Sequence, residues 1–240
     1  MLPKLKIALF SLTLFISSIL FSWIIWSKVD FAYPALHYAM GIEQHIDKYG
    51  PQNRYRKGFE LTDKPEQVRL FSEIVDAIHN EGQGLKELVY FDGNGKPIRR
   101  LLRHPEVVHL KDVANLVDSF YLVSTIALAI LIAVIVYMFY KKQPFPSLKQ
   151  QAIGILSFSA VSTILILIIG PVKVFYALHE WVFPENHQWF FYYQESLMTV
   201  LMKAPDLFGA IAALISVLAI GIYLAINTLL QKYSRPKHPH

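Results

Sequence analysis

Four long apolar segments constrain the fold of this chain more than any other feature. They cover residues 7–26, 120–140, 152–170 and 207–230, and none contains Asp, Glu, Lys or Arg. A helix of about twenty residues is about 30 Å long, which matches the hydrocarbon core of a bilayer. Buried helices of a soluble bundle would each carry a polar stripe, and none of these segments has one. The sequence therefore predicts an all-α polytopic membrane protein with four transmembrane helices.

The first apolar segment could instead be a cleaved signal peptide, because Lys4 and Lys6 precede it. It is long for such a peptide, however, and it ends in Trp23, Trp26 and Lys28 where small cleavage-site residues would be needed. We therefore expect an uncleaved first helix.

The distribution of charge predicts the orientation. The two tails and the loop between the second and third apolar segments contain Lys and Arg but no acid, whereas every Asp and Glu lies within residues 30–118 or 180–206. By the positive-inside rule, both termini are expected in the cytoplasm and both acidic stretches outside it. The net charge of +5 thus reflects orientation and does not indicate nucleic-acid binding. The chain has no cysteine, which excludes disulfides and thiolate chemistry.

The segments between the helices complete the predicted organisation. The first outer segment contains an amphipathic pattern at 64–80 and two short strand-like runs, 88–91 and 98–102, so it reads as a small mixed extracytoplasmic cap. We expect transmembrane helix 1 in 1–28, the cap in 29–104, an interfacial helix continuing into transmembrane helix 2 in 105–140, a cytoplasmic loop in 141–151, transmembrane helix 3 in 152–170, an aromatic extracytoplasmic loop in 171–206, transmembrane helix 4 in 207–230 and a cytoplasmic tail in 231–240.

Two histidine motifs are predicted to lie near the outer membrane surface. His109 follows Glu106 and precedes Asp112, each at a spacing of three, so all three share one helix face. A carboxylate that holds an imidazole fixes its tautomer and raises its basicity, which is how a general base is built. The second motif, LHEWVFPENHQWFFYY at 178–193, places His179 and Glu180 among seven aromatic residues.

Several interpretations of the histidines remain open from the residues alone. His109 and His179 could be interfacial residues within an aromatic belt, with His187 a simple turn residue. They could bind haem, or bind zinc together with Asp112 and Glu180, although no HExxH spacing is present. They could also perform acid–base chemistry on a lipid head group without a metal. No GxSxG motif indicates a serine nucleophile.

These stretches resemble the motifs of a known family. HPEVVHLKDV at 104–113 resembles E-x-x-H-[LM]-x-D-V, and residues 178–208 resemble F-H-E-x-F-F…W…D-S-L-x…P-x-x-F. Both motifs belong to the bacterial lipoprotein intramolecular transacylases, four-helix integral membrane proteins formerly of unknown function. Leu110 replaces the commoner methionine, and Leu178 and Trp181 replace phenylalanines. The resemblance extends over nearly the whole chain.

The resemblance implies a reaction within one substrate, in the bacterial inner membrane. A diacylglyceryl-modified lipoprotein would pass its sn-2 acyl chain to the amine of its own N-terminal cysteine, giving a lyso-form lipoprotein. The family's catalytic histidines correspond to His109 and His179, without cofactor, metal or covalent acyl-enzyme. Membrane lipid is the other expected partner.

We expect Asp112, Glu106 and Glu180 to orient or support the two histidines. Aromatic residues would form the substrate pocket and exclude water, since hydrolysis competes with aminolysis; they are Trp181, Phe183, Trp189, Phe190, Phe191, Tyr192 and Tyr193. Two other functions fit the same residues: a non-catalytic lipid-binding or assembly membrane protein, and a zinc-dependent membrane hydrolase.

Overall fold

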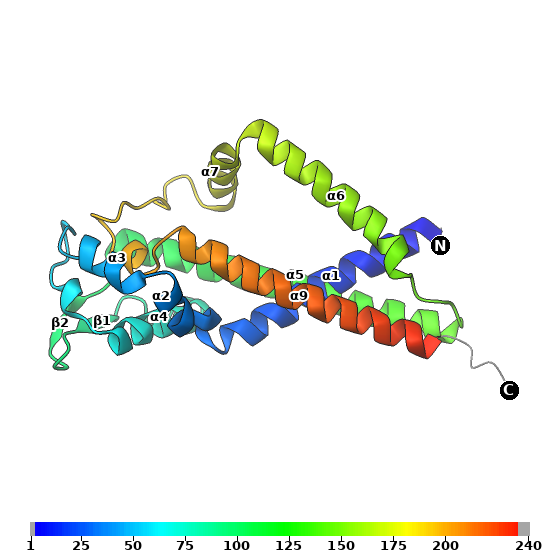
Figure 1. Cartoon of the computed structure of the whole chain (residues 1–240), viewed down its shortest axis with the longest axis horizontal. Helices are drawn as coiled ribbons and strands as arrows, with labels where there is room; N and C mark the ends of the chain where they lie inside the picture. Colours follow the sequence, from blue (N-terminus) through cyan, green and yellow to red (C-terminus); the bar gives the residue numbers. More distant parts are fainter. Residues whose placement is uncertain (1–2, 235–240) are drawn as a thin grey trace. The chain divides into compact units, whose positions relative to one another are not determined.

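The chain is mostly helical (Figure 1). The structure, a computed structural model, describes residues 3–234, without the side chains of residues 3, 153, 156, 158, 159, 162, 163, 171, 172 and 234. Residues 1–2 and the last part of the predicted tail, 235–240, lie outside the described residues. The elements are α1 (Pro3–Ser27), η1 (Asp30–Ala32), α2 (Tyr33–Ala39), α3 (Ile42–Tyr49), η2 (Phe59–Leu61), α4 (Lys64–Ile78), β1 (Val89–Phe91), β2 (Pro97–Arg100), α5 (His104–Tyr140), α6 (Leu148–Ile169), α7 (Pro171–Val182), α8 (Leu197–Leu201) and α9 (Asp206–Ser234).

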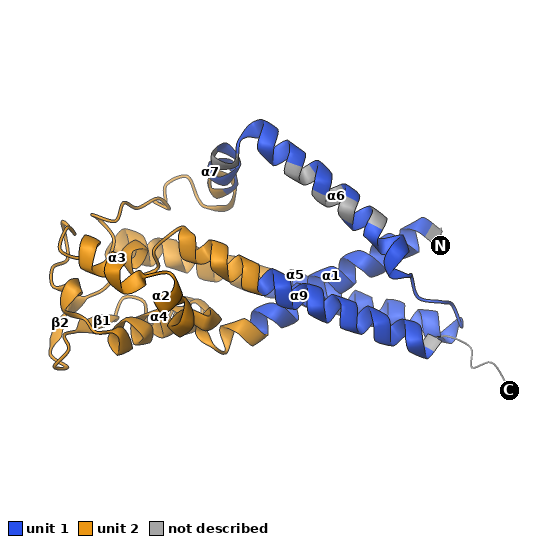
Figure 2. Cartoon of the chain, in the orientation of Figure 1, with its two compact units in different colours: residues 1–24, 121–178, 215–240 blue, residues 25–120, 179–214 orange. Residues whose placement is uncertain are grey.

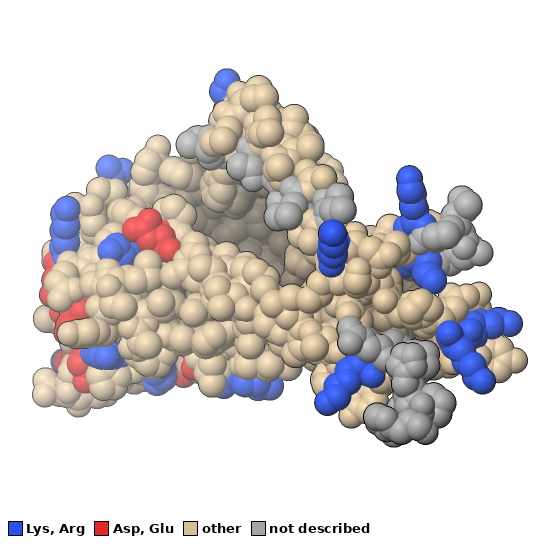
Figure 3. Space-filling model, turned by 45° about the vertical axis from the view of Figure 1, so that its right-hand side comes forward, with Lys and Arg blue, Asp and Glu red and all other residues tan. Residues whose placement is uncertain are grey.

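These elements form two compact units (Figure 2). Unit 1 contains residues 1–24, 121–178 and 215–240, and unit 2 contains residues 25–120 and 179–214. Every Asp and Glu of the chain falls in unit 2, whereas the charged residues of unit 1 are all Lys or Arg. Figure 3 shows the acidic side chains of one face gathered over unit 2.

Unit 1 holds the apolar parts of the long helices. Among the described residues, three helices are long and apolar enough to cross a membrane: Lys4–Ser27, His104–Tyr140 and Asp206–Tyr233. They coincide with the first, second and fourth apolar segments of the sequence. The third segment forms α6, whose first turn is fixed by a capping box between Ser147 and Gln150.

The core of unit 1 joins α1, α5 and α9. Phe10 and Leu14 of α1, Leu131 and Met138 of α5, and Tyr223 of α9 form one buried cluster. Such packing between apolar helices is what associates them once each is inside a bilayer.

A break separates α6 from α7, where the sequence reads as one continuing helix. Gly170 ends α6 with φ +98°, which only glycine adopts readily. Pro171 then starts α7, and a proline both lacks the N–H needed to continue the previous helix and suits a first helical turn. The histidine motif at 178–193 therefore begins on a short separate helix.

Unit 2 is built around α2, α3, α4 and the first turns of α5. Its core includes Tyr33, which stacks on Phe71 of α4 at 4.0 Å between ring centroids and donates its hydroxyl to the carbonyl of Leu201 at 2.8 Å. α4 starts where the Asp63 side chain accepts from the backbone N–H of Glu66, which caps the helix. β1 and β2 form an antiparallel hairpin, so helices and a small sheet combine in this unit.

Candidate active site

His109 lies on the second turn of α5, within unit 2. α5 begins at His104-Pro105-Glu106, and proline and an acidic residue are both favoured at a helix start. The imidazole of His109 is half-buried, with its centroid 4.9 Å from the ring of Phe183 and 5.9 Å from the ring of Phe191. Its Nδ1 atom is buried and has no hydrogen-bond partner in the part of the chain that the structure describes. This nitrogen can therefore accept or donate a hydrogen bond to a substrate.

His179 lies in the last turn of α7. Its ring is 4.7 Å from the ring of Trp189 and 5.5 Å from that of Phe183. Phe183, which is only 9% exposed, thus contacts both histidines. From the two ring distances, the imidazoles of His109 and His179 lie within about 10 Å of each other. Two motifs 70 residues apart meet at one position in unit 2.

The segment 183–196, which joins α7 to α8, carries the rings around both histidines. It is bonded to α5 at two points. Ser196 Oγ donates to Glu106 Oε1 at 2.5 Å, and His187 Nδ1 donates to Asp112 Oδ2 at 2.7 Å. Glu106 is fully buried, and it also accepts from the backbone N–H of Arg103 at 2.7 Å.

Glu106, Asp112 and Glu180 were expected to orient or support the two histidines, but the structure gives them other surroundings. Asp112 binds His187 and Glu106 binds Ser196 and Arg103, so neither hydrogen bonds His109. A spacing of three brings residues to one helix face, but here that face is covered by the 183–196 segment, which supplies closer partners. Glu180 is exposed and has no hydrogen bond or ion pair with any described side chain, so it does not orient His179.

Only part of the predicted aromatic pocket surrounds the histidines. Phe183, Trp189 and Phe191 contact them. Trp181 is 82% exposed and Tyr192 61% exposed, so neither ring encloses the pair. Phe190 packs between the rings of Trp189 and Tyr192, at 6.1 and 5.1 Å.

Tyr193 belongs to a separate aromatic cluster. Its ring is 4.5 Å from His45 and 4.8 Å from Tyr49, and its hydroxyl donates to the carbonyl of Ala204 at 2.5 Å. Burial raises the pKa of Tyr193, with a contribution from Asp206. Burial also lowers the pKa of His45, which favours its neutral form. This cluster packs α3 against the segment that precedes α8, and the histidine pair lies outside it.

His187 and Ser196 are the residues that sequence reasoning missed. His187 does close a turn, because its backbone N–H donates to the carbonyl of Pro184 at 2.9 Å, but its side chain also binds Asp112. The pairing joins positions 75 residues apart, and no local spacing in the sequence indicates it.

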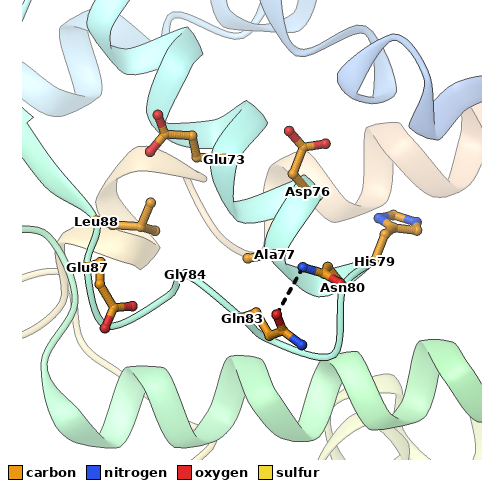
Figure 4. A pocket seen from close by; sticks show the side chains of 9 residues that line it. All are labelled: Glu73, Asp76, Ala77, His79, Asn80, Gln83, Gly84, Glu87 and Leu88. Atoms are coloured by element: carbon orange, nitrogen blue, oxygen red, sulfur yellow. Dashed lines mark hydrogen bonds between the residues drawn. The ribbon is translucent and has the colours of Figure 1, made fainter.

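An open pocket of about 640 Å³ lies elsewhere in unit 2, at the end of α4 (Figure 4). A hydrogen bond of 3.5 Å from Asn80 to Gln83 crosses one side of it. None of the predicted site residues lines this pocket, whose lining is Glu73, Asp76, Ala77, His79, Asn80, Gln83, Gly84, Glu87 and Leu88.

The zinc interpretation requires side chains that do not converge. Within residues 3–234, no three His, Asp or Glu side chains are grouped so that they could hold a metal ion. The proposed ligand set needs Asp112 and Glu180 beside the histidines, yet Asp112 is bonded to His187 and Glu180 points to the exterior.

Two comparisons with known proteins point to the same family. Residues 5–205 match the model of the family described as lipoprotein intramolecular transacylase Lit. Among solved structures, the chain is similar to the membrane-integral lipoprotein intramolecular transacylase Lit from Bacillus cereus, in a form with a histidine-to-arginine substitution: TM-score 0.67 and 16% identity, over 96% of this chain and 91% of that one. A search of curated proteins gives no match. The protein is a multi-pass membrane protein, and it belongs to the lipoprotein intramolecular transacylase family.

Proposed function

We propose that the chain moves the sn-2 acyl chain of a diacylglyceryl-modified lipoprotein to the α-amino group of that lipoprotein's own N-terminal cysteine. The product is a lyso-form lipoprotein, and His109 and His179 are the acid–base pair. One observation carries the proposal: the imidazoles of the two motifs lie within about 10 Å of each other, and both contact the buried ring of Phe183. The reacting ester and the attacking amine together are large enough to contact both imidazoles.

The two histidines can supply every proton transfer that the reaction needs. The amine attacks the ester carbonyl carbon, and one imidazole takes the proton that the nitrogen loses. The other imidazole gives a proton to the departing sn-2 oxygen, so an amide bond forms as the ester C–O bond breaks. Histidine suits both roles because a neutral imidazole nitrogen can accept a proton and a protonated imidazole can donate one. The unpartnered, buried Nδ1 of His109 supports such contact with the substrate.

Positioning supplies much of the remaining catalysis. Nucleophile and ester already belong to one molecule, so the protein has to hold that molecule in a folded, ring-like conformation. Well-oriented intramolecular reactions of this kind gain up to about 7–11 kcal/mol. The buried rings of Phe183 and Phe191 also keep water from the ester, which protects the transfer from competing hydrolysis.

We further propose a topology of four membrane spans, with α6 as the third. In this arrangement residues 29–104 form an extracytoplasmic cap, both termini are cytoplasmic, and the histidine pair faces the extracytoplasmic side of the bacterial cell membrane. The confinement of all acidic residues to unit 2 supports the orientation. Membrane lipid surrounds the spans and presents the substrate.

Mass spectrometry of a diacylglyceryl lipopeptide incubated with the purified protein tests the proposal. Intramolecular transfer is an isomerisation, so the intact mass stays the same while fragmentation shows an acyl group on the cysteine nitrogen. A hydrolase would release a fatty acid and reduce the mass. A lipid-binding protein would return the substrate with its acyl chain still on the glyceryl oxygen, and that result would refute the proposal.

A further inference from the structure

Two hydrogen bonds fix the aromatic segment 183–196 to α5, one on each side of His109. Ser196 donates to Glu106, three residues before His109, and His187 donates to Asp112, three residues after it. The first bond is fully buried, with 0% exposure of Ser196 and Glu106. The second is sheltered, since the side chains of His187 and Asp112 are 31% and 12% exposed.

His187 takes part in a turn of this segment and in its attachment to α5. Its backbone N–H donates to the carbonyl of Pro184, which closes a turn within the segment, while its side chain bonds Asp112 on α5. The rings that contact the two catalytic histidines lie close to it in the sequence: Phe183 before it, and Trp189 and Phe191 after it. A shift of His187 would therefore move rings on both sides of the site.

We propose that His187 is a positioning residue for the transfer: through Asp112 it holds the segment in the register that places Phe183 against both imidazoles, and so it sets the separation of His109 and His179. The inference rests on the proposed function, because the distance it sets matters only if both histidines act on one substrate. In this proposal, Asp112 holds the segment 183–196 through His187 and does not fix the tautomer of His109.

Replacing the His187 side chain and measuring kcat for acyl transfer tests this role. His187→Ala should lower kcat by about 10–100-fold with little change in KM, because a misplacement of about 1 Å is costly while the lipid-binding surface stays intact. A larger share of the substrate should be hydrolysed. His187→Asn keeps a donor nitrogen close to the position of Nδ1 and should recover most of the rate. The double variant of His187→Ala with Asp112→Ala should be no slower than the slower single variant, because both remove the same bond.

A matched control and a second measurement separate positioning from simple stability. Asn186→Ala changes an exposed neighbour in the same turn and should keep the wild-type rate and product ratio. Backbone hydrogen exchange of residues 183–196, measured in the full-length protein, should speed up in His187→Ala and remain close to wild type in His187→Asn.

The outcomes distinguish this inference from the proposed function. If the wild-type protein makes no N-acylated product, the proposed function fails, and the exchange measurement still decides whether His187 holds the segment. If the wild-type protein is active and His187→Ala keeps its kcat and product ratio, His187 does not position the site. Unchanged exchange in His187→Ala would equally overturn the inference.

Discussion

Replacing Phe183 with alanine would remove the ring that contacts both histidines. The side chain is 9% exposed, so nearly all of its apolar surface is lost from a packed site. Phe→Ala changes in protein interiors cost about 3–5 kcal/mol. The segment 183–196 lies between helices and can partly collapse onto the gap, so we expect a cost near the lower end of that range. Most domains have about 5–15 kcal/mol of stability, and the variant should stay folded.

The same change should slow catalysis by an amount comparable to its cost in folding stability. Without Phe183, both imidazoles lose a ring that they pack against, so each can shift. A displacement of about 1 Å can reduce a rate by about 10²-fold. Water would also enter the gap beside the ester. We therefore expect kcat for transfer to fall by about 10²-fold, or about 2.7 kcal/mol in activation free energy, with a growing fraction of free fatty acid.

The assay is the lipopeptide reaction followed by mass spectrometry, which separates N-acylated product from fatty acid. Trp181→Ala is the matched comparison, because it truncates an aromatic ring two residues away that is 82% exposed. It should be clearly milder than Phe183→Ala. Equal rates in wild type and Phe183→Ala, or equal damage in the two variants, would refute the reasoning that enclosure by Phe183 organises the site.

Three further predictions follow from the same structure. His109→Ala and His179→Ala should each slow transfer by about 10²–10⁴-fold, and the double variant should match the worse single variant, because the two groups act as a unit; additive losses would mean separate roles. Ser196→Ala should lower the melting temperature, at a cost of roughly 1–3 kcal/mol, because buried Glu106 loses a donor; an unchanged melting curve would contradict this. An impermeant thiol reagent should label Lys86→Cys but not Lys142→Cys in intact cells, since the native chain has no cysteine; the reverse pattern would overturn the topology.

The proximity of His109 and His179 could be predicted, because it depends on which side of the membrane each histidine lies, and the apolar segments indicate that side. Counting charge-free segments predicts which loops share a side of the membrane, and each histidine follows or precedes one such segment closely. The three candidate spans that the structure supports were all visible in this way. The separation of α6 from α7 was not, since Gly170-Pro171 also occurs within kinked helices and only the backbone at φ +98° distinguishes the two.

The inward-facing rings could not be identified from the sequence. Residues 183–196 form no regular element apart from turns, so no period of two or 3.6 tells which side chains face inward. Trp181 and Phe183 look alike as aromatic residues near His179, yet their exposures are 82% and 9%. The partner of Asp112 was equally hidden, because a carboxylate three residues from one histidine can bond another that a loop brings close.

The spacing of Glu106, His109 and Asp112 serves to attach the segment 183–196 on both sides of His109 along the helix. In the reaction that we propose, no covalent nucleophile takes part, so its rate depends on how accurately two imidazoles and a folded substrate are held. Three residues on one helix face can provide a catalytic group with an anchor on each side of it. The two anchors bind Ser196 and His187, and the rings that enclose the site follow the register that those bonds impose. A variant that moved either anchor by one residue would turn it about 100° around α5, away from its partner, and it should lose transfer activity even with both histidines in place.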